Sequence, residues 1–163
     1  MKTHNYVRVL YADDNDDDRL MISIMLGFSD IKVTGANTVA EAWRLARTER
    51  FDLYLLDSRF SDGSGLDLCR RLCEHAPRTP ILFYSGNAYE ADKQEGLAAG
   101  ANEYLVKPDF EDLAPTILRL TGRAANPKLN GRLLRPKKGN TNAGEYILFS
   151  ECRISRPIPD SEL

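Results

Sequence analysis

The stretch Phe51 to Gly65, FDLYLLDSRFSDGSG, decides the fold. It begins with an unbroken apolar run at 53–56, in which no position is left for solvent. Such a run predicts a strand that is buried on both faces, as in the middle of a parallel sheet. Asp57 follows where the strand should end, and open α/β sheets bind their ligands beyond the carboxyl ends of the strands. Taken alone, Asp57 is explained equally well as a loop aspartate that caps the next helix.

The rest of the chain repeats the alternation of strand and helix. Strands are expected at 6–12, 31–35, 53–56, 81–84 and 104–106, and helices at about 20–28, 39–49, 65–75, 90–99 and 112–120. Five such rounds with short links predict an α/β domain, with right-handed crossovers and a parallel sheet covered by helices on both faces.

Apolar residues recur at helical spacing in each expected helix. In chain order they are Leu20, Met21, Ile24, Met25 and Phe28; Val39, Ala42, Trp43 and Ala46; Leu66, Cys69, Leu72 and Cys73; Leu97 and Ala98; and Leu113, Ile117, Leu118 and Leu120. A run of acids at 13–18 precedes the first of these helices. Capping uses one or two of the five aspartates, and the surplus repels unless a cation or solvent absorbs it.

Polar residues stand at the carboxyl ends of the expected strands, where they can converge on one crevice. They are Asp13 and Asp14 after the first strand, Asp57 after the third, Ser85 after the fourth and Lys107 after the fifth. Clustered carboxylates repel unless a cation intervenes, and oxygen-only ligands favour a hard ion such as Mg²⁺. A metal ion opposite a lysine suits a phosphoryl group, whose transfer is catalysed mainly by positioning and charge neutralisation.

With these residues in place, the sequence resembles the receiver domains of two-component response regulators. The motifs that carry the resemblance are the acid pair after VRVLYA, Asp57 after LYLL, Ser85-Gly86 after ILFY, and YLVKP at 104–108. ANTVAEA (36–42) and AAGANEYLVKP (98–108) are also similar to the family. The resemblance covers residues 5–122. It implies a flavodoxin-like, doubly wound five-stranded parallel sheet of strand order 2-1-3-4-5.

The resemblance implies that Asp57 accepts a phosphoryl group from a sensor histidine kinase or a histidine phosphotransfer protein. Asp14 would bind Mg²⁺ directly and Asp13 through water, while Arg59 would offer its backbone carbonyl. On these terms the chain is not an enzyme, beyond catalysing its own phosphorylation and dephosphorylation.

The remaining family residues imply a switch. Lys107 would pair with the phosphoryl oxygens, and Pro108 would follow a cis peptide that aims the lysine. Ser85 would move to the phosphoryl group, and the ring of Tyr104 would turn into the vacated space.

The loop after Asp57 departs from the family pattern. It has Phe60 and Ser61 where Met-Pro is usual, so we expect a looser loop. Arg59 places a bulky cation beside the acceptor, and a phosphohydrolase with an aspartate nucleophile would instead want an acid at that position.

The composition fits one soluble domain with an appendage. The chain has 163 residues, and no apolar run approaches the roughly 20 residues that cross a bilayer. Without a signal pattern, a cytoplasmic protein is expected, with no membrane partner. Cys69, Cys73 and Cys152 show no metal-ligand spacing and are better explained as small apolar residues.

Residues 123–163 form a basic tail. They hold eight basic and four acidic residues, so they carry a net charge of +4, and the rest of a chain of net charge −2 carries a net charge of −6. Tyr146 to Phe149 is strand-like, and three alternatives remain open: a hairpin with 132–134, a cover for the last helix, or disorder until a partner arrives. The tail is too short for the family's usual DNA-binding output domains.

The favoured function is a stand-alone signalling module, in which phosphorylation changes the protein partner. A homodimer is a second expected consequence. The alternative is a DNA-binding regulator acting through the basic tail, although a short basic cluster without interleaved aromatics makes nucleic acid the less expected partner.

Overall fold

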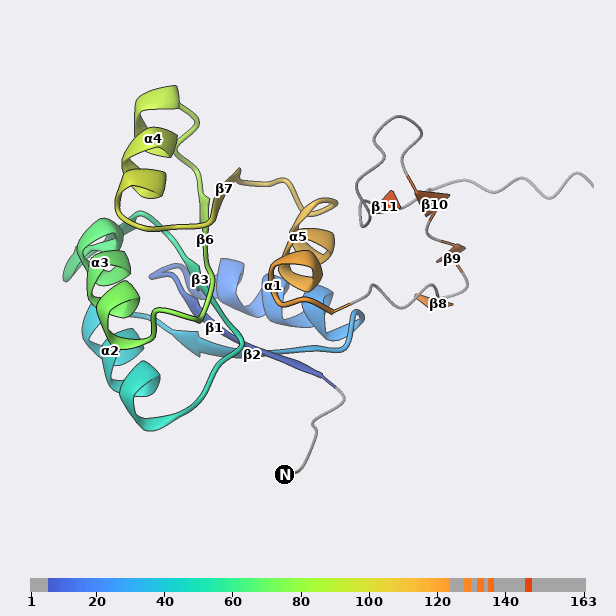
Figure 1. The fold of residues 1–163 in the computed structure, drawn as a ribbon, viewed down its shortest axis with the longest axis horizontal. Coiled ribbons are helices and arrows are strands. Elements are labelled where there is room, and N and C mark those ends of the chain that lie inside the picture. Colours follow the sequence, from blue (N-terminus) through green and yellow to red (C-terminus); the bar gives the residue numbers. More distant parts are fainter. Residues whose placement is uncertain (1–5, 124–127, 130–131, 134, 137–145, 148–163) are drawn as a thin grey trace, which may run out of the picture.

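The computed structural model describes residues 6–123, together with 128–129, 132–133, 135–136 and 146–147. Five parallel strands form one sheet in the order β2-β1-β3-β6-β7 (Figure 1). Their bounds are Val7–Ala12 (β1), Ile31–Ala36 (β2), Leu53–Leu56 (β3), Ile81–Ser85 (β6) and Glu103–Val106 (β7). Since β6 and β7 are the fourth and fifth strands of this sheet, the predicted α/β fold and strand order are confirmed.

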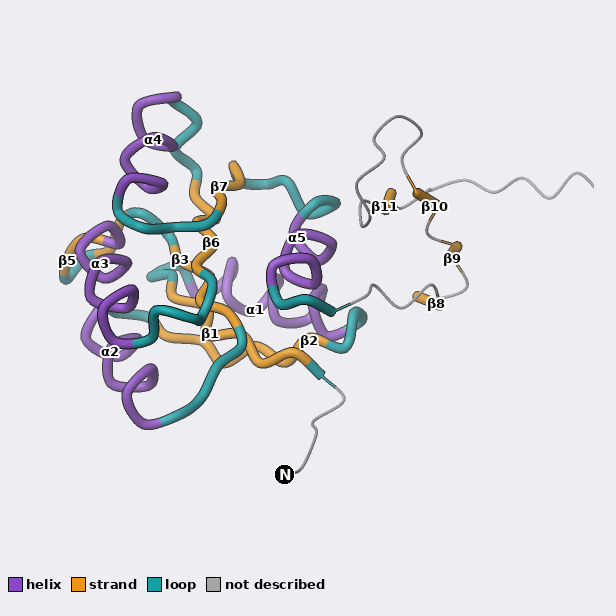
Figure 2. Tube along the Cα trace, in the orientation of Figure 1, coloured by secondary structure: helices purple, strands orange, loops and turns teal. Residues whose placement is uncertain are grey.

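Helices alternate with these strands along the chain and cover both faces of the sheet (Figure 2). Their bounds are Asp16–Gly27 (α1), Val39–Thr48 (α2), Gly65–His75 (α3), Glu90–Ala98 (α4) and Leu113–Leu120 (α5). Helices α1 and α5 pack on one face, while α2 and α3, with Ala99 directly after α4, pack on the other. No helix in the described residues is long and apolar enough to cross a membrane.

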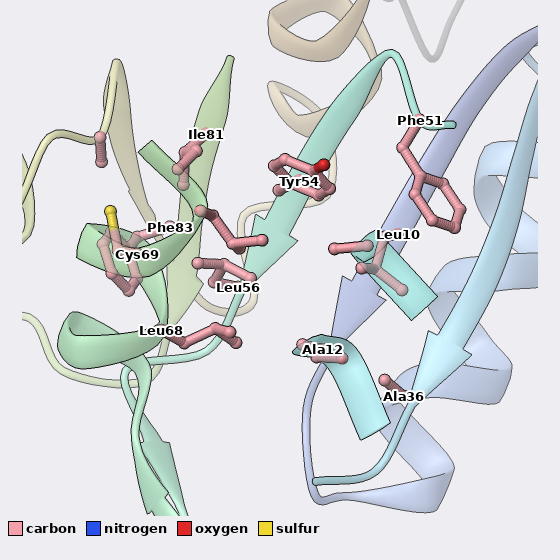
Figure 3. Close-up of a cluster of buried hydrophobic side chains, with 14 of the residues drawn as sticks. Leu10, Ala12, Ala36, Phe51, Tyr54, Leu56, Leu68, Cys69, Ile81 and Phe83 are labelled. Carbon is pink, nitrogen blue, oxygen red and sulfur yellow. The ribbon is translucent and has the colours of Figure 1, made fainter. Parts of the chain in front are cut away.

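Strand β3, the apolar run at 53–56, lies at the centre of the sheet. Every residue of β3 is buried, and β3 pairs with β1 on one side and β6 on the other. Side chains alternate along a strand, so Leu53 and Leu55 face α1 and α5, whereas Tyr54 and Leu56 face α2 and α3. Figure 3 shows the buried cluster on the α2 and α3 side of the sheet, which includes Leu56 and Leu68.

Polar side chains begin the first two helices. The side chain of Asn15 accepts hydrogen bonds from the backbone N–H groups of Asp17 and Asp18, so an asparagine, and not an aspartate, caps α1. Thr38 caps α2 by accepting from Glu41 N. Pro115 lies in the first turn of α5, where its missing N–H costs no helical hydrogen bond.

The apolar spacing predicted α1 correctly but not the side that it buries. The two residues of α1 buried against the sheet are Ile22 and Leu26. The five residues that carried the spacing are all exposed, from 38% for Met25 to 63% for Leu20. The helix is apolar around much of its circumference, and the sheet covers only one side of it.

The apolar spacing predicts that Leu97 and Ala98 lie on the inner side of α4, and this prediction is wrong. Leu97 is 47% exposed and Ala98 is also exposed, whereas Gly96 and Ala99 are buried. A Cβ on Gly96 would lie 2.9 Å from the ring of Tyr104, so the helix turns its glycine toward β7.

The described tail residues form two short antiparallel pairs. Lys128–Leu129 (β8) pairs with Arg132–Leu133 (β9), and Arg135–Pro136 (β10) pairs with Tyr146–Ile147 (β11). Of the strand-like segment, residues 146–147 thus pair with 135–136, whereas 132–133 of the expected partner pair with 128–129. Cys152 and residues 148–149 lie outside the described residues.

Candidate functional site

The sheet itself positions three of the polar residues that end its strands. Asp13 N donates to Ala36 O (3.0 Å), Asp57 N donates to Ala12 O (2.9 Å) and Lys107 N donates to Ser85 O (2.9 Å). Each of these bonds continues the hydrogen-bond ladder beyond the strand ends. The side chains of Asp13, Asp57 and Lys107 thus start from a fixed backbone on one edge of the sheet.

The charged half of the site consists of three carboxylates around one ammonium group. Lys107 Nζ lies 2.5 Å from Asp13, 2.9 Å from Asp18 and 2.9 Å from Asp57. The Asp13 side chain is 1% exposed and those of Lys107 and Asp57 are 16% and 15% exposed. Such shielded charges interact more strongly than surface ion pairs, and each depends on the others.

Burial and ion pairing act on Lys107 in opposite directions. Burial alone would lower the pKa of its ammonium group, but the hydrogen bonds to Asp13, Asp57 and Asp18 outweigh it and raise the pKa above the ordinary value. Lys107 therefore stays charged at neutral pH. The pKa of Tyr11 is also raised, by burial first and then by the hydrogen bond of its hydroxyl to Asp13 (2.5 Å).

The hydroxyl half of the site lies on the other side of Asp57 and consists of Ser58, Ser85, Asn87 and Tyr104. Ser85 Oγ donates to Asp57 Oδ1 (2.7 Å) and lies 2.7 Å from Ser58 Oγ. Asn87 Nδ2 donates to Ser58 Oγ (3.2 Å), and the Tyr104 hydroxyl donates to the Asn87 carbonyl (2.9 Å). Hydrogen bonds between neutral side chains, together with the backbone carbonyl of Asn87, thus connect the carboxylate of Asp57 to Tyr104.

The loop after Asp57 is well tethered, which contradicts the expected looseness. Arg59–Phe60 (β4) and Gly63–Ser64 (β5) pair as a small antiparallel hairpin. Ser61 N donates to Asp14 Oδ2 (3.1 Å), and Asp62 accepts from the first N–H groups of α2 at Val39 (2.9 Å). These contacts tie the loop to Asp14 and to α2, although it has no proline.

Gly65 sets the distance between α3 and the backbone of Asp57. A Cβ built on Gly65 would lie 2.0 Å from the carbonyl oxygen of Asp57, far inside any real contact. Gly65 N donates to Ser58 O (3.1 Å), so the helix begins directly behind the aspartate.

The structure gathers most of the predicted residues but not all. Asp13, Asp57, Ser85 and Lys107 lie within one hydrogen-bonded cluster, and Tyr104 joins through Asn87. The Lys107–Pro108 peptide is cis. Asp14 and Arg59 lie at the exposed rim, and no group of three or more acidic, histidine or cysteine side chains in the described residues is arranged to hold a metal ion.

Four participants were not singled out from the sequence: Tyr11, Asp18, Ser58 and Asn87. Asp18 did leave a signal, because the surplus acids at 13–18 required a cation, and Lys107 is that cation. Ser58 and Asn87 are small polar loop residues and left none.

A cavity of about 170 Å³ borders the charged half, between α1 and the loop that precedes α5. Its lining includes Met21, Ile22, Tyr84, Lys107 and Phe110. Burial raises the pKa of Tyr84 to about 12, although the nearby Lys107 lowers it in part. The Tyr84 hydroxyl is the single buried side-chain polar atom of the described residues without a hydrogen-bond partner.

Comparison with known proteins gives one consistent answer. Residues 9–118 match the family model described as the response regulator receiver domain. The chain is 35% identical over 132 residues to the response regulator protein PilR of Pseudomonas aeruginosa, covering 78% of this chain and 30% of that one. It is 33% identical over 120 residues to the probable transcriptional regulatory protein TcrX of Mycobacterium tuberculosis, covering 71% of this chain and 51% of that one.

Solved structures agree. The chemotaxis response regulator CheY4 of Vibrio cholerae is 31% identical with a TM-score of 0.66, over 71% of this chain and 99% of that one. A putative response regulator from Chloroflexus aurantiacus is 26% identical with a TM-score of 0.69, over 73% of this chain and all of that one. By contrast, the chain spans from about a third to about half of the curated relatives named above.

Proposed function

Since this chain belongs to the response regulator receiver domain family of two-component signalling, we propose that Asp57 is its phosphoryl acceptor. A histidine kinase or a histidine phosphotransfer protein would supply the group. A carboxylate oxygen of Asp57 attacks the phosphorus, the bond from phosphorus to the donor nitrogen breaks, and an acyl phosphate forms on Asp57.

The position of Asp57 between a cation and a hydroxyl donor is the observation that carries this proposal. Lys107 Nζ contacts Oδ2 and Ser85 Oγ donates to Oδ1. Charge that develops on phosphoryl oxygens beside Asp57 would meet both groups without reorganisation of the backbone. Because its pKa is raised, the side chain of Lys107 is already protonated and needs no proton from the reaction.

By its chemistry the donor set suits Mg²⁺, although the side chains are not grouped as a metal site in the described residues. Asp13, Asp14 and Asp57 offer carboxylate oxygens and Arg59 a backbone carbonyl, which are the hard ligands this ion prefers. Asp14 would bind the ion directly, and Asp13, which Lys107 and Tyr11 already hold, through water. Bound there, Mg²⁺ would neutralise negative charge on the phosphoryl oxygens.

The hydroxyl half would carry the response. Once a phosphoryl group stands on Asp57, Ser85 donates to it, and its bonds within the half are remade. Tyr104 is the outermost member of this half, and its ring stacks on Phe83 at 5.7 Å. Rearrangement would thus reach α4 and β7, the surface proposed to change its affinity for a downstream protein or a second copy.

Regulation, and not turnover, is the proposed activity. The chain would catalyse only its own phosphorylation and dephosphorylation. A phosphohydrolase of the aspartate-nucleophile type would need an acid two positions after Asp57, where Arg59 stands exposed. A cytoplasmic location is proposed on the same family grounds.

A second candidate is a transcriptional regulator, favoured by the relatives that carry such a name and by their greater length. The basic tail would then meet DNA. A salt-dependent DNA gel shift of the full chain tests it, because phosphate contacts by Lys and Arg weaken steeply as salt rises.

Intact mass spectrometry tests the acceptor. The chain is incubated with acetyl phosphate and Mg²⁺, and we expect one phosphoryl group per chain, lost in Asp57→Asn. Glu74→Gln, which changes an exposed carboxylate of α3, is the matched control and should be phosphorylated like the unaltered protein. Undiminished modification of Asp57→Asn would place the acceptor elsewhere.

A further inference from the structure

Helix α1 presents an exposed apolar stripe that lies outside the hydrogen-bonded cluster around Asp57. The α1 stripe consists of Leu20, Met21, Ile24, Met25 and Phe28, which are 63%, 40%, 56%, 38% and 60% exposed. The two other exposed large apolar residues in the described part of the chain, Tyr89 and Leu97, lie on or beside α4. Contiguous apolar patches on a soluble domain mark a docking surface.

The amino-terminal end of the stripe is acidic. Asp16, Asp17 and Asp18 fill the first turn of α1, and its last turn has no basic residue. At helical spacing Asp17 falls on the same side as Ile24 and Phe28. Asp16 pairs with Arg19 and Asp18 with Lys107, whereas Asp17 is exposed and has no ion-pair partner among the described residues. A complementary partner would therefore be basic where it meets the first turn of α1 and apolar where it covers the stripe.

The tail of this chain has that composition. Residues 132–138, RLLRPKK, hold four basic residues, and YILF follows at 146–149. The pairing of β10 with β11 sets Arg135 opposite Ile147, so a basic residue of the first segment lies beside an apolar residue of the second. The opposite net charges of body and tail favour their contact at low salt.

The connection is long enough. Helices α1 and α5 pack on the same face of the sheet and both start at its carboxyl edge, so the chain leaves α5 near the end of α1 (Figure 1). The twelve residues of α1 span about 18 Å at about 1.5 Å each. Because residues 128–133 fold back as the β8–β9 pair, the reach comes from the five steps before the pair and the two after it, which span about 23 Å when extended. Arg135 can therefore reach Asp17 while β11 returns along the stripe.

We propose that the tail segment 132–149, which includes the β10–β11 hairpin pair, docks on the α1 stripe of its own chain. Tethering gives the hairpin an effective concentration on the order of millimolar, an advantage that a free partner lacks. Met21 belongs to the stripe and also lines the cavity beside Lys107, so the docked hairpin borders the phosphoacceptor site. A protein that needs this side of the site would have to displace the hairpin first. The proposal does not depend on the phosphorylation of Asp57.

Methionine methyl NMR on the full chain tests this contact directly. The chain has three methionines, and two of them, Met21 and Met25, lie on the stripe. In Ile147→Glu we expect the methyl signals of Met21 and Met25 to shift by more than a linewidth while that of Met1 stays in place. Unmoved Met21 and Met25 signals in Ile147→Glu and in Leu148→Glu would overturn the proposal.

A charge reversal tests the acidic end. Asp17→Lys should move the same two signals in the same direction as Ile147→Glu, and added salt should do so in the unaltered chain. Glu74→Lys, an equal charge change at an exposed site on α3, is the control and should leave them in place. Equal effects of the two reversals would mean that net charge, and not docking at α1, moves the signals.

Dilution separates the other occupants. The tethered contact is intramolecular, so the Met21 and Met25 signals should not depend on protein concentration. Signals that move on dilution would assign the stripe to a second copy and overturn the proposal. Signals that respond to neither dilution nor the tail substitutions would leave the stripe to another protein, with the same consequence.

Discussion

The charged half and the hydroxyl half of the site meet at Asp57 but are held by different forces. In the charged half three carboxylates depend on one ammonium group, with Lys107 Nζ within 2.9 Å of each. In the hydroxyl half neutral donors and acceptors follow one another from Asp57 to Tyr104. Removing a charge partner leaves a buried charge uncompensated, whereas removing a hydroxyl costs one modest bond. The difference suggests that the first half holds the site together and the second half can rearrange cheaply.

Loss of Lys107 should give the largest effect on folding. We expect Lys107→Ala to lower the free energy of unfolding by about 2–3 kcal/mol, below the range for fully buried pairs because Asp18 is partly exposed. Mg²⁺ should restore part of the loss, since it supplies a cation to the same carboxylates. Urea unfolding with and without Mg²⁺ measures both.

One outcome would contradict this expectation. Full stability of Lys107→Ala without Mg²⁺ would mean that solvent screens the three carboxylates adequately. Lys93→Ala, which removes the exposed 3.9 Å ion pair of Lys93 with Glu90, is the control and should leave the free energy of unfolding almost unchanged.

In Lys107→Ala we also expect slow phosphorylation to persist, with a smaller structural response around Tyr104.

Substitution of the acid pair should affect metal binding more than folding. We expect Asp14→Asn to weaken Mg²⁺ binding by about tenfold, equivalent to about 1.4 kcal/mol. Asp14 lies at the rim with a backbone contact from Ser61, so its loss should leave stability unchanged or slightly raised. Asp13→Asn should weaken binding less but cost stability, because Asp13 is buried against Lys107 and Tyr11.

Mg²⁺ titrations followed by Trp43 fluorescence or NMR shifts decide between these residues. Unchanged Mg²⁺ affinity in both variants would remove the acid pair from the metal site. A greater loss of affinity in Asp13→Asn than in Asp14→Asn would reverse their assigned roles.

Substitution of Ser58 tests the hydroxyl half, whose side chains are neutral. Ser58→Ala deletes the link between Ser85 and Asn87, and a hydrogen bond of this kind contributes about 1 kcal/mol. We expect nearly unchanged stability and Mg²⁺ affinity, but a weaker NMR response of Tyr104 to beryllofluoride. Ser61→Ala, in the same loop, is the control: the hydrogen bond of Ser61 to Asp14 uses its backbone N–H. Equal NMR responses of Tyr104 to beryllofluoride in both variants would show that Ser58 does not link Asp57 to Tyr104.

The smallest expected effect is that of pH on the charged half. The pKa of Lys107 is raised from its ordinary value of 10.5, so its contribution to stability is complete below that value and is lost only as pH rises further. The stability difference between the unaltered protein and Lys107→Ala should thus stay constant from about pH 7 to about pH 9. A difference that shrinks in this interval would show that burial, and not ion pairing, controls the lysine.

The sequence predicted the fold well because its signals were local and repeated. The apolar run at β3 and the polar residues after each strand are enough to order a parallel sheet and to place Asp13, Asp57, Ser85 and Lys107 at one edge. Periodicity predicts a helix but not its rotation when apolar residues surround it, which is why the outward face of α1 was not foreseen.

Contacts between loops could not be predicted for a different reason. Ser58 and Asn87 belong to no periodic pattern, and their hydrogen bond exists only because β3 and β6 lie side by side. The hairpin of β4 and β5 rests on strands of two residues each, below the length at which alternation can be recognised.

Gly65 makes the site intolerant to variation at a position that carries no functional group. Any side chain there would collide with the carbonyl oxygen of Asp57 and push the acceptor, or the start of α3, out of place. In a saturation library scored for phosphorylation, position 65 should accept glycine alone, whereas the neighbouring exposed position 62 should accept several residues. Sequence drift in this chain is therefore restricted most sharply behind the aspartate, at a residue that never touches a ligand.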